Sequence, residues 1–325
     1  MATLYTFKNL QDEVLATLDE VGNTDTTLTL VKNFLNQAHV TRLGQDPWPF
    51  LRWDGPETFT TSTSTRFYTL HPEFWRPDYF YNRTAGEFLV EVPQRQIAQT
   101  GDRWSSDTGR TPYFRWAGLL PVAAQPTSAS AITIVSSAAG DNTSAKAITI
   151  DGIVSGVRRQ ESITPSGTTP VASTLSFTKV LAVTKAADWT GTMTMTSNSG
   201  AVTNLVLLPT EYARQYRQIE LLRTPTSADT IEYVFFRQPR KMVSDNDLPD
   251  IPSPHAQILV WDALILFSGY NTDLPAQAVQ VWHGLQQEME ANMRRLWLEG
   301  TAQEAHPRYI RPASDGGAVP RVFGD

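Results

Sequence analysis

The chain has 325 residues, a formal net charge of −6, 18% charged residues and no cysteine. Its length allows two domains and a sizeable core. The acidic balance argues against a basic surface that clamps nucleic acid, and the lack of cysteine excludes disulfides and cysteine-based metal sites. With Trp 9, Tyr 10 and Phe 14 beside so few charges, we expect part of the surface to be buried against other chains.

The first fifty or so residues predict two helices. Apolar residues recur at helical spacing from Phe7 to Val21 and again from Thr27 to Leu43. The link between them is short, so we expect the two helices to pack antiparallel. The start of the chain has no basic region followed by an apolar core, and no apolar run is long enough to span a membrane, so we expect neither a signal peptide nor a membrane segment.

A β-rich region follows, in which Thr, Tyr, Phe and Trp alternate with Pro breaks from Trp53 to Trp116. Strands are expected again at Arg217–Leu222 and Asp229–Arg237, and the segment between them suits a hairpin loop. The best strand candidates in the first part are Phe67–Leu70, Phe88–Val92 and Tyr113–Trp116.

Residues 127–208 differ in composition: they are rich in Ser and Thr, and Phe177 and Trp189 are the only aromatic residues among them. Short alternating strands with turn residues at this spacing favour an immunoglobulin-like β-sandwich. The string Ala-Ile-Thr-Ile occurs at 131–134 and again at 147–150, which suggests two arms of one hairpin. Because strands resume after this block, we interpret it as an insertion.

The last third of the chain is helical by its pattern. The stretch from His255 to Tyr270 is apolar on more than one face, which predicts a helix buried on several sides. A second helix is expected from Pro275 to Glu299, with one apolar stripe. From Thr301 the chain is rich in Pro and Gly, and an extended tail is expected.

These elements predict an α+β fold: a helical bundle of N-terminal and C-terminal helical hairpins, a small β-body and an inserted immunoglobulin-like β-sandwich. The expected domains are a discontinuous core of residues 1–126 and 209–300, the insert of residues 127–208, and a tail of residues 301–325.

No residue pattern predicts catalysis, a cofactor or a metal. The five histidines, at 39, 71, 255, 283 and 306, lack zinc-ligand spacing. Asp245, Asn246, Asp247 and Asp250 are spaced like oxygen ligands for calcium, but the turn glycine and terminal glutamate of a helix–loop–helix site are missing, so an acidic loop is the better interpretation. Phosphate-binding loops and nucleophile elbows are absent from the sequence. We therefore expect a protein that is not an enzyme.

The arrangement resembles the head-to-tail adaptor, or head-completion connector, proteins of tailed bacteriophages. The likeness covers residues 1–120 and 210–300. It is carried by the two N-terminal helices and the Pro47-Trp48-Pro49-Phe50 that ends them, by the strand Tyr233–Pro239 leading into Leu248–Pro252, by the helix around Ala263-Leu264, and by the long final helix. The Ser- and Thr-rich insert departs from the compact members of that family.

The resemblance implies a structural virion protein at the head-to-tail junction, assembled in the host cytoplasm. It would form a ring of about twelve copies, bind the portal protein and a tail or nozzle protein, and extend the channel through which double-stranded DNA passes without sequence-specific binding. A ring needs two different adhesive faces on each subunit. The candidate interface residues are Trp261, Trp282, Trp297, Tyr309 and Phe323. Packing in the core is an equal alternative for each of the three Trp.

Two other classes of function stay open. The sandwich and the aromatic β-body could form a carbohydrate-binding or adhesin-type module, for which exposed coplanar aromatic rings in a groove would be the sign. The other is a hydrolase of unrecognised type, for which no nucleophile and base can be named from the sequence.

Overall fold

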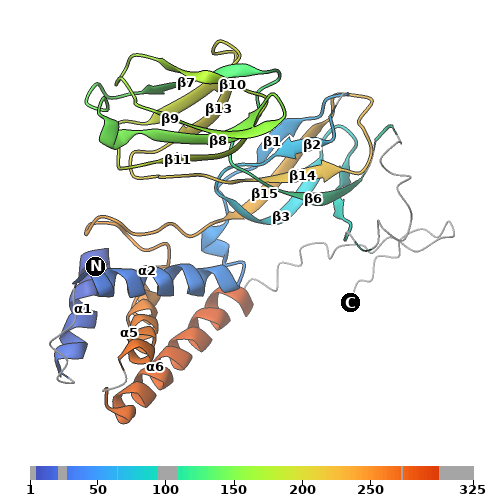
Figure 1. Ribbon diagram of the computed structural model, residues 1–325. Helices are drawn as coiled ribbons and strands as arrows, with labels where there is room; N and C mark the ends of the chain where they lie inside the picture. Colours follow the sequence, from blue (N-terminus) through green and yellow to red (C-terminus); the bar gives the residue numbers. More distant parts are fainter. Residues whose placement is uncertain are drawn as a thin grey trace, which may run out of the picture. The chain divides into compact units, whose positions relative to one another are not determined.

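The computed structural model describes residues 5–20, 28–63, 65–93, 95, 108–110, 112–271 and 274–299 (Figure 1). The chain divides into two compact units. We call residues 1–54 and 235–325 the helical unit and residues 55–234 the β unit. The boundary between them falls inside the last strand of the chain.

Helix α5 (Ile258–Tyr270) lies at the centre of the helical unit. It is apolar on all sides, and α1, α2 and α6 each contact it. The other helices are α1 (Phe7–Glu20), α2 (Leu28–Gln45) and α6 (Ala276–Arg294), which a π-helical turn, η4 (Arg295–Glu299), continues, together with short 3-10 turns η1 (Pro49–Leu51) and η3 (Ser253–His255). The periodicity thus located all four helices to within a few residues.

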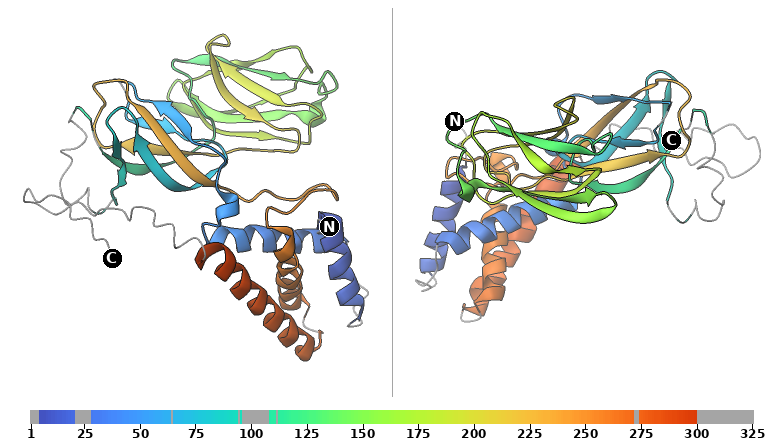
Figure 2. Two further views of the ribbon diagram at one scale, coloured as in Figure 1. Left: turned by 180° about the vertical axis from the view of Figure 1, so that it is seen from behind. Right: turned by 45° about the horizontal axis from the view of Figure 1, so that its top comes forward.

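The first two helices do not pack antiparallel as expected. Figures 1 and 2 show α2 running across α1 at a steep angle. Their link, residues 21–27, lies outside the described residues. Both helices bury their apolar stripes against α5, through residues such as Leu10, Leu35 and Leu264. The crossing angle is therefore governed by a partner more than two hundred residues away in the sequence.

Two four-stranded sheets form an aromatic body in the β unit. One has the order β1-β15-β3-β4 and the other the order β2-β14-β6-β5. Ring contacts join Phe74 and Phe80 of β3 to Trp116 of β6 and Tyr233 of β15. The strands are β1 (Glu57–Thr60), β2 (Phe67–Thr69), β3 (Phe74–Asn82), β4 (Glu87–Phe88), β5 (Val90–Glu91), β6 (Tyr113–Leu120), β14 (Tyr216–Leu221) and β15 (Thr230–Arg237).

The insert is a two-sheet sandwich with its own hydrophobic core. Side chains from both sheets fill this core, among them Ile134, Ile150, Phe177 and Met195. Its strands are β7 (Ser130–Ser136), β8 (Ile148–Val154), β9 (Val157–Ile163), β10 (Val171–Phe177), β11 (Lys179–Lys185), β12 (Met193–Ser197) and β13 (Val202–Leu207), in the orders β10-β7-β12-β13 and β11-β8-β9.

The strand order of the insert is not that of an immunoglobulin domain. There the first strand pairs with the second, and the third lies beside the sixth. Here the first strand, β7, lies between the fourth and the sixth, while β8 pairs with β9 and β11. The two Ala-Ile-Thr-Ile strings consequently sit in β7 and β8 on opposite sheets, and the hairpin expected from them is wrong.

The expected fold class is also wrong. The described residues are mostly β, with fifteen strands in four sheets and four α-helices, and not a helical bundle with a small β-body. Strands with irregular patterns were underestimated. Pro77 of β3 is an example, because proline in a sequence usually indicates a break in a strand. Strand β4 pairs with β3 only at Tyr81 and Asn82. On that edge of the sheet no backbone N–H is therefore needed from Pro77, and the strand tolerates it.

The expected hairpin of the last two strands is wrong for a related reason. Strand β14 pairs with β2 and β6, whereas β15 pairs with β1 and β3. The chain between them therefore crosses from one sheet to the other, and pairing across sheets leaves no local sequence signal.

A buried carboxylate ties three segments of the sandwich together. Asp141 is fully buried and accepts hydrogen bonds from Ser136 Oγ (2.6 Å), Lys146 Nζ (2.6 Å), Thr190 N (2.8 Å) and Gly191 N (2.9 Å). Burial would raise the pKa of Asp141, but these four donors outweigh it and lower the pKa well below the usual range for Asp.

Replacing Asp141 by Asn should destabilise the sandwich by about 3 kcal/mol, because Lys146 loses its charged partner and the new amide N–H₂ faces a donor. Hydrogen exchange of peptides from residues 130–207, measured by mass spectrometry, should become faster. Asp151→Asn is the matched control, since Asp151 pairs with the exposed Arg158 and should change exchange little. Equal effects of the two substitutions would contradict the assignment.

Candidate functional site

The helical unit is fastened by a buried ionic network around Arg42. The Arg42 side chain, on the last turn of α2, is 7% exposed. Its Nε and Nη2 donate to the two carboxylate oxygens of Asp262 on α5, at 2.8 and 2.6 Å, and its Nη1 donates to Glu290 on α6, at 2.5 Å. Burial disfavours the charged form, but Asp262 and Glu290 outweigh it and raise the pKa of Arg42. Three helices therefore meet at one guanidinium.

Arg294 extends this network along α6. It lies 2.9 Å from Glu290 on its own helix and 2.7 Å from Asp46 just beyond α2. Burial would raise the pKa of Glu290, but hydrogen bonds from Arg294 and Arg42 lower it. All five charged side chains of the network are therefore paired. Two ion pairs hold α6 in place: Glu290 with Arg42 of α2, and Arg294 with Asp46 directly after α2.

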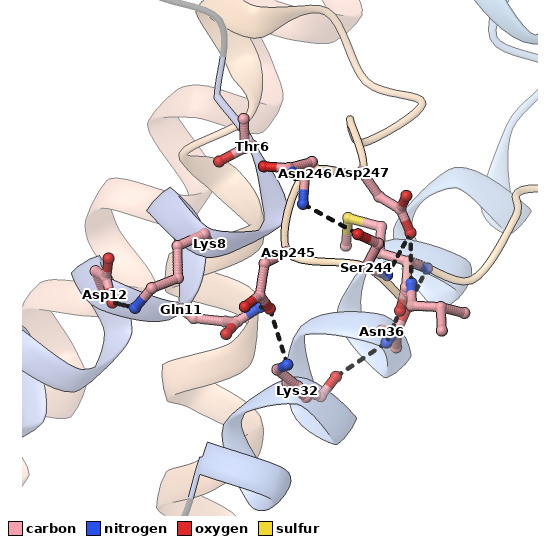
Figure 3. A network of polar contacts seen from close by, with 12 residues as sticks. Thr6, Lys8, Gln11, Asp12, Lys32, Asn36, Ser244, Asp245, Asn246 and Asp247 are labelled. Atoms are coloured by element: carbon pink, nitrogen blue, oxygen red, sulfur yellow. Dashed lines mark hydrogen bonds and ion pairs between the residues drawn. The ribbon is translucent and has the colours of Figure 1, made fainter.

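Residues 238–252, which we call the strap, are held on one face of α2 (Figure 3). Lys32, Asn36 and His39 are four and three residues apart and so share that face. Lys32 Nζ lies 2.8 Å from Asp245, Asn36 exchanges two hydrogen bonds with the backbone of Met242, and His39 Nε2 accepts the backbone N–H of Asp250 at 3.0 Å.

The strap also caps helix α1. The backbone N–H groups of Phe7 and Lys8 donate to the carbonyls of Asp247 and Asp245, at 2.8 and 2.9 Å. The first N–H groups of a helix have no partner within it, so the strap satisfies two of them. Because the carboxylates of Asp245, Asp247 and Asp250 face different partners, they do not converge on a cation. Among the described residues no group of three or more His, Asp or Glu could hold a metal ion.

The candidate interface residues fall in two groups. Trp282 is buried in the helical core, and Trp261 and Trp297 are half-buried and pack against the same core. The ring of Trp297 meets Phe50 edge-on, with centroids 5.5 Å apart. Tyr309 and Phe323 lie outside the described residues.

Several other apolar side chains of the helical unit are exposed, although the sequence pattern placed Val281, Leu285 and Leu296 on one apolar stripe with Trp282. Val281 (59% exposed) and Leu285 (36%) are four residues apart on α6 and therefore lie next to each other, flanking the buried side that carries Trp282; we call them the outer face of α6. Tyr270 at the end of α5 (69%) and Leu296 in η4 (59%) are exposed as well. On the strap, Val243 and Leu248 are more than half exposed. The signal for the outer face is the i, i+4 spacing of Val281 and Leu285 beside the buried stripe.

Comparison with known proteins adds no family. No protein-family model matches the chain, and no curated protein matches it. Within the described residues, none of the helices combines the length and apolar character needed to cross a membrane.

Replacing Arg42 by Met should cost about 3–5 kcal/mol of unfolding free energy, because Asp262 is left mostly buried without a cation and Glu290 keeps only Arg294. Urea unfolding followed by far-ultraviolet circular dichroism measures the loss. A second change, Asp262→Leu in the Arg42→Met background, should recover part of it. Lys8→Gln is the control, since the Lys8–Asp12 pair is exposed. A loss no larger than that of the control would contradict a central role for Arg42.

The stability of the helical unit should fall as the pH drops from about 6.5 to 5. His39 is fully buried, and burial lowers its pKa although the charge of Asp250 opposes this in part. Between the lowered folded pKa and the ordinary unfolded value of about 6.5, the unfolded chain binds more protons, so acidification favours unfolding. The loss is at most about 1.4 kcal/mol per pH unit for one proton.

Urea midpoints at pH 7.5, 6.5 and 5.5 measure this dependence. His39→Gln should reduce it, because the Gln side chain can accept the Asp250 N–H without titrating. The exposed His283 provides the control substitution, His283→Gln. An unchanged pH profile in His39→Gln would place the dependence elsewhere, for instance at His255, whose pKa burial also lowers.

Proposed function

We propose that this chain is a structural subunit of a ring-shaped assembly, the head-to-tail adaptor of a tailed bacteriophage virion. In this role it joins the portal protein to a tail or nozzle protein and extends the channel for double-stranded DNA. The proposal starts from the resemblance of the helix and strap segments described above, and it concerns assembly and not catalysis.

One observation carries the proposal: the helical unit exposes apolar side chains on two separate elements. Val281 and Leu285 form the outer face of α6, and Val243 and Leu248 stand out from the strap. Large apolar side chains exposed in a group mark interaction surfaces. A ring is built from head-to-tail contacts, in which one surface of a subunit meets a different surface of the next. Two distinct apolar surfaces fit this requirement.

The rigidity of the unit supports the same role. The Arg42 network and the strap fix α1, α2, α5 and α6 without help from another chain. A subunit whose helices are already in place loses little conformational entropy on assembly. The outer face of α6 is then presented on a pre-formed surface.

Substituting Glu for Val281 and Leu285 together should prevent assembly, because two carboxylates would be buried in an apolar contact. Mass photometry of the full chain, alone and mixed with the portal protein of the same virus, should show a closed oligomer for the parent and only monomers for this variant. Gln280→Glu with Gln287→Glu adds the same charge to exposed positions of α6 and is the matched control.

Thermal unfolding should be similar for all three chains, since the four positions are exposed. A parent chain that stays monomeric even with the portal would overturn the proposal. A monomer that instead binds glycans would favour the carbohydrate-binding alternative.

A further inference from the structure

Buried or half-buried arginines in the β unit are usually paired with acids. Glu220, itself almost fully buried, is shared by the half-buried Arg66 and Arg115, and the buried Asp229 and Glu232 are held by the exposed Arg110 and Arg83. Each pair joins neighbouring strands or loops of the aromatic body. This pattern is expected, because a charge that leaves water needs a partner.

Arg76 of β3 and Arg217 of β14 break this pattern. Both side chains are half-buried, yet in the part of the chain that the structure describes neither guanidinium has an ion pair or a hydrogen bond. Burial lowers the pKa of Arg217, and the positive charge of Arg76 lowers it further, so the two like charges are within electrostatic reach.

Aromatic rings hold both guanidiniums in place. The Arg76 guanidinium carbon lies 4.7 Å from the ring centroid of Trp75, and that of Arg217 lies 5.9 Å from the ring centroid of Trp116. Strands β3 and β14 contact each other, and Trp116 also meets Phe74 of β3 at 5.7 Å. A guanidinium stacked on an indole keeps its N–H edges free and oriented, which is how arginine recognises oxyanions.

The charge of the pair selects the ligand. A carboxylate carries one negative charge and would leave one guanidinium uncompensated. A phosphate group carries about −1.5 to −2 at neutral pH and has several acceptor oxygens, so it can pair with two guanidiniums at once. The covered faces of Trp75 and Trp116 make stacking of a sugar or a base on those same faces less suitable.

We infer that Arg76 and Arg217, held by Trp75 and Trp116, form a binding site for a phosphate group on the aromatic body of the β unit. The site lies in β3, β6 and β14 and uses no residue of the surfaces proposed for ring assembly (Figure 1). It therefore stands or falls independently of the adaptor role.

Isothermal titration calorimetry of the full chain with inorganic phosphate, in a phosphate-free buffer, tests the site. Arg76→Gln and Arg217→Gln should each weaken binding at least about tenfold, the effect of losing one charge-assisted hydrogen bond. Arg159→Gln removes the same charge from an exposed position of β9 and should leave binding unchanged. Without phosphate, the first two variants should unfold at the same temperature as the parent or higher, because each removes one of two neighbouring like charges.

Competition with a single-stranded oligonucleotide that lacks a terminal phosphate identifies the source of the phosphate. Displacement of inorganic phosphate supports the site and makes the nucleic-acid backbone its ligand, with two neighbouring phosphodiesters, each carrying one negative charge, in place of one phosphate of higher charge. Lack of displacement supports the site for free phosphate or a phosphate monoester. The inference is overturned if inorganic phosphate does not bind, or if it binds all four chains equally. A lower unfolding temperature of both variants in phosphate-free buffer would also count against it, since it would show that the arginines are structural.

Discussion

The helical unit depends on a single buried cation. Helix α5 has apolar side chains all round and Asp262 as its one charged residue, so hydrophobic burial alone would allow it many rotations about its axis. Arg42 removes this freedom. Its guanidinium donates hydrogen bonds to both carboxylate oxygens of Asp262 and to Glu290 on α6. Only one rotation of each helix about its axis brings these groups together. Buried ion pairs add little net stability, but they can select one arrangement among several apolar ones. We infer that this is the role of Arg42.

The strap also packs on α2, where its backbone groups find hydrogen-bond partners. An irregular segment such as residues 238–252 carries backbone groups that no sheet or helix satisfies. Asn36 and His39 of α2 satisfy two of its N–H groups, and the strap in return gives two carbonyls to the start of α1. Helix α2 thus organises the unit through two sets of side chains, one for α5 and α6 and one for the strap. Each contact joins parts of the chain about two hundred residues apart, so neither end of the chain alone contains all the parts of the unit.

Sequence reasoning succeeded where structure is local and failed where it is not. Periodicity located the four helices, and the uniform apolar pattern of α5 predicted its central position. Pairing across the chain left no comparable trace: the two Ala-Ile-Thr-Ile strings lie on opposite sheets, and β14 and β15 do not pair. Arg42 and Asp262 are 220 residues apart in the sequence, and the residues next to them do not indicate that they form a pair. Trp residues were an uncertain guide to interfaces, because a large ring fits a core equally well, as Trp282 does.

The features that remain unexplained by the fold itself are the most informative about function. Elsewhere in the described chain, buried acids such as Asp141, Glu220 and Asp229 have cationic partners. Two features differ from this pattern. Arg76 and Arg217 have no acidic partner in the described chain, and the apolar outer face of α6 is exposed. Local violations of packing and charge rules concentrate at functional sites, because there the missing partner is another molecule. The two departures call for different chemistry, an apolar neighbour at α6 and an oxyanion at β3 and β14. A protein that meets more than one partner would leave such a combination.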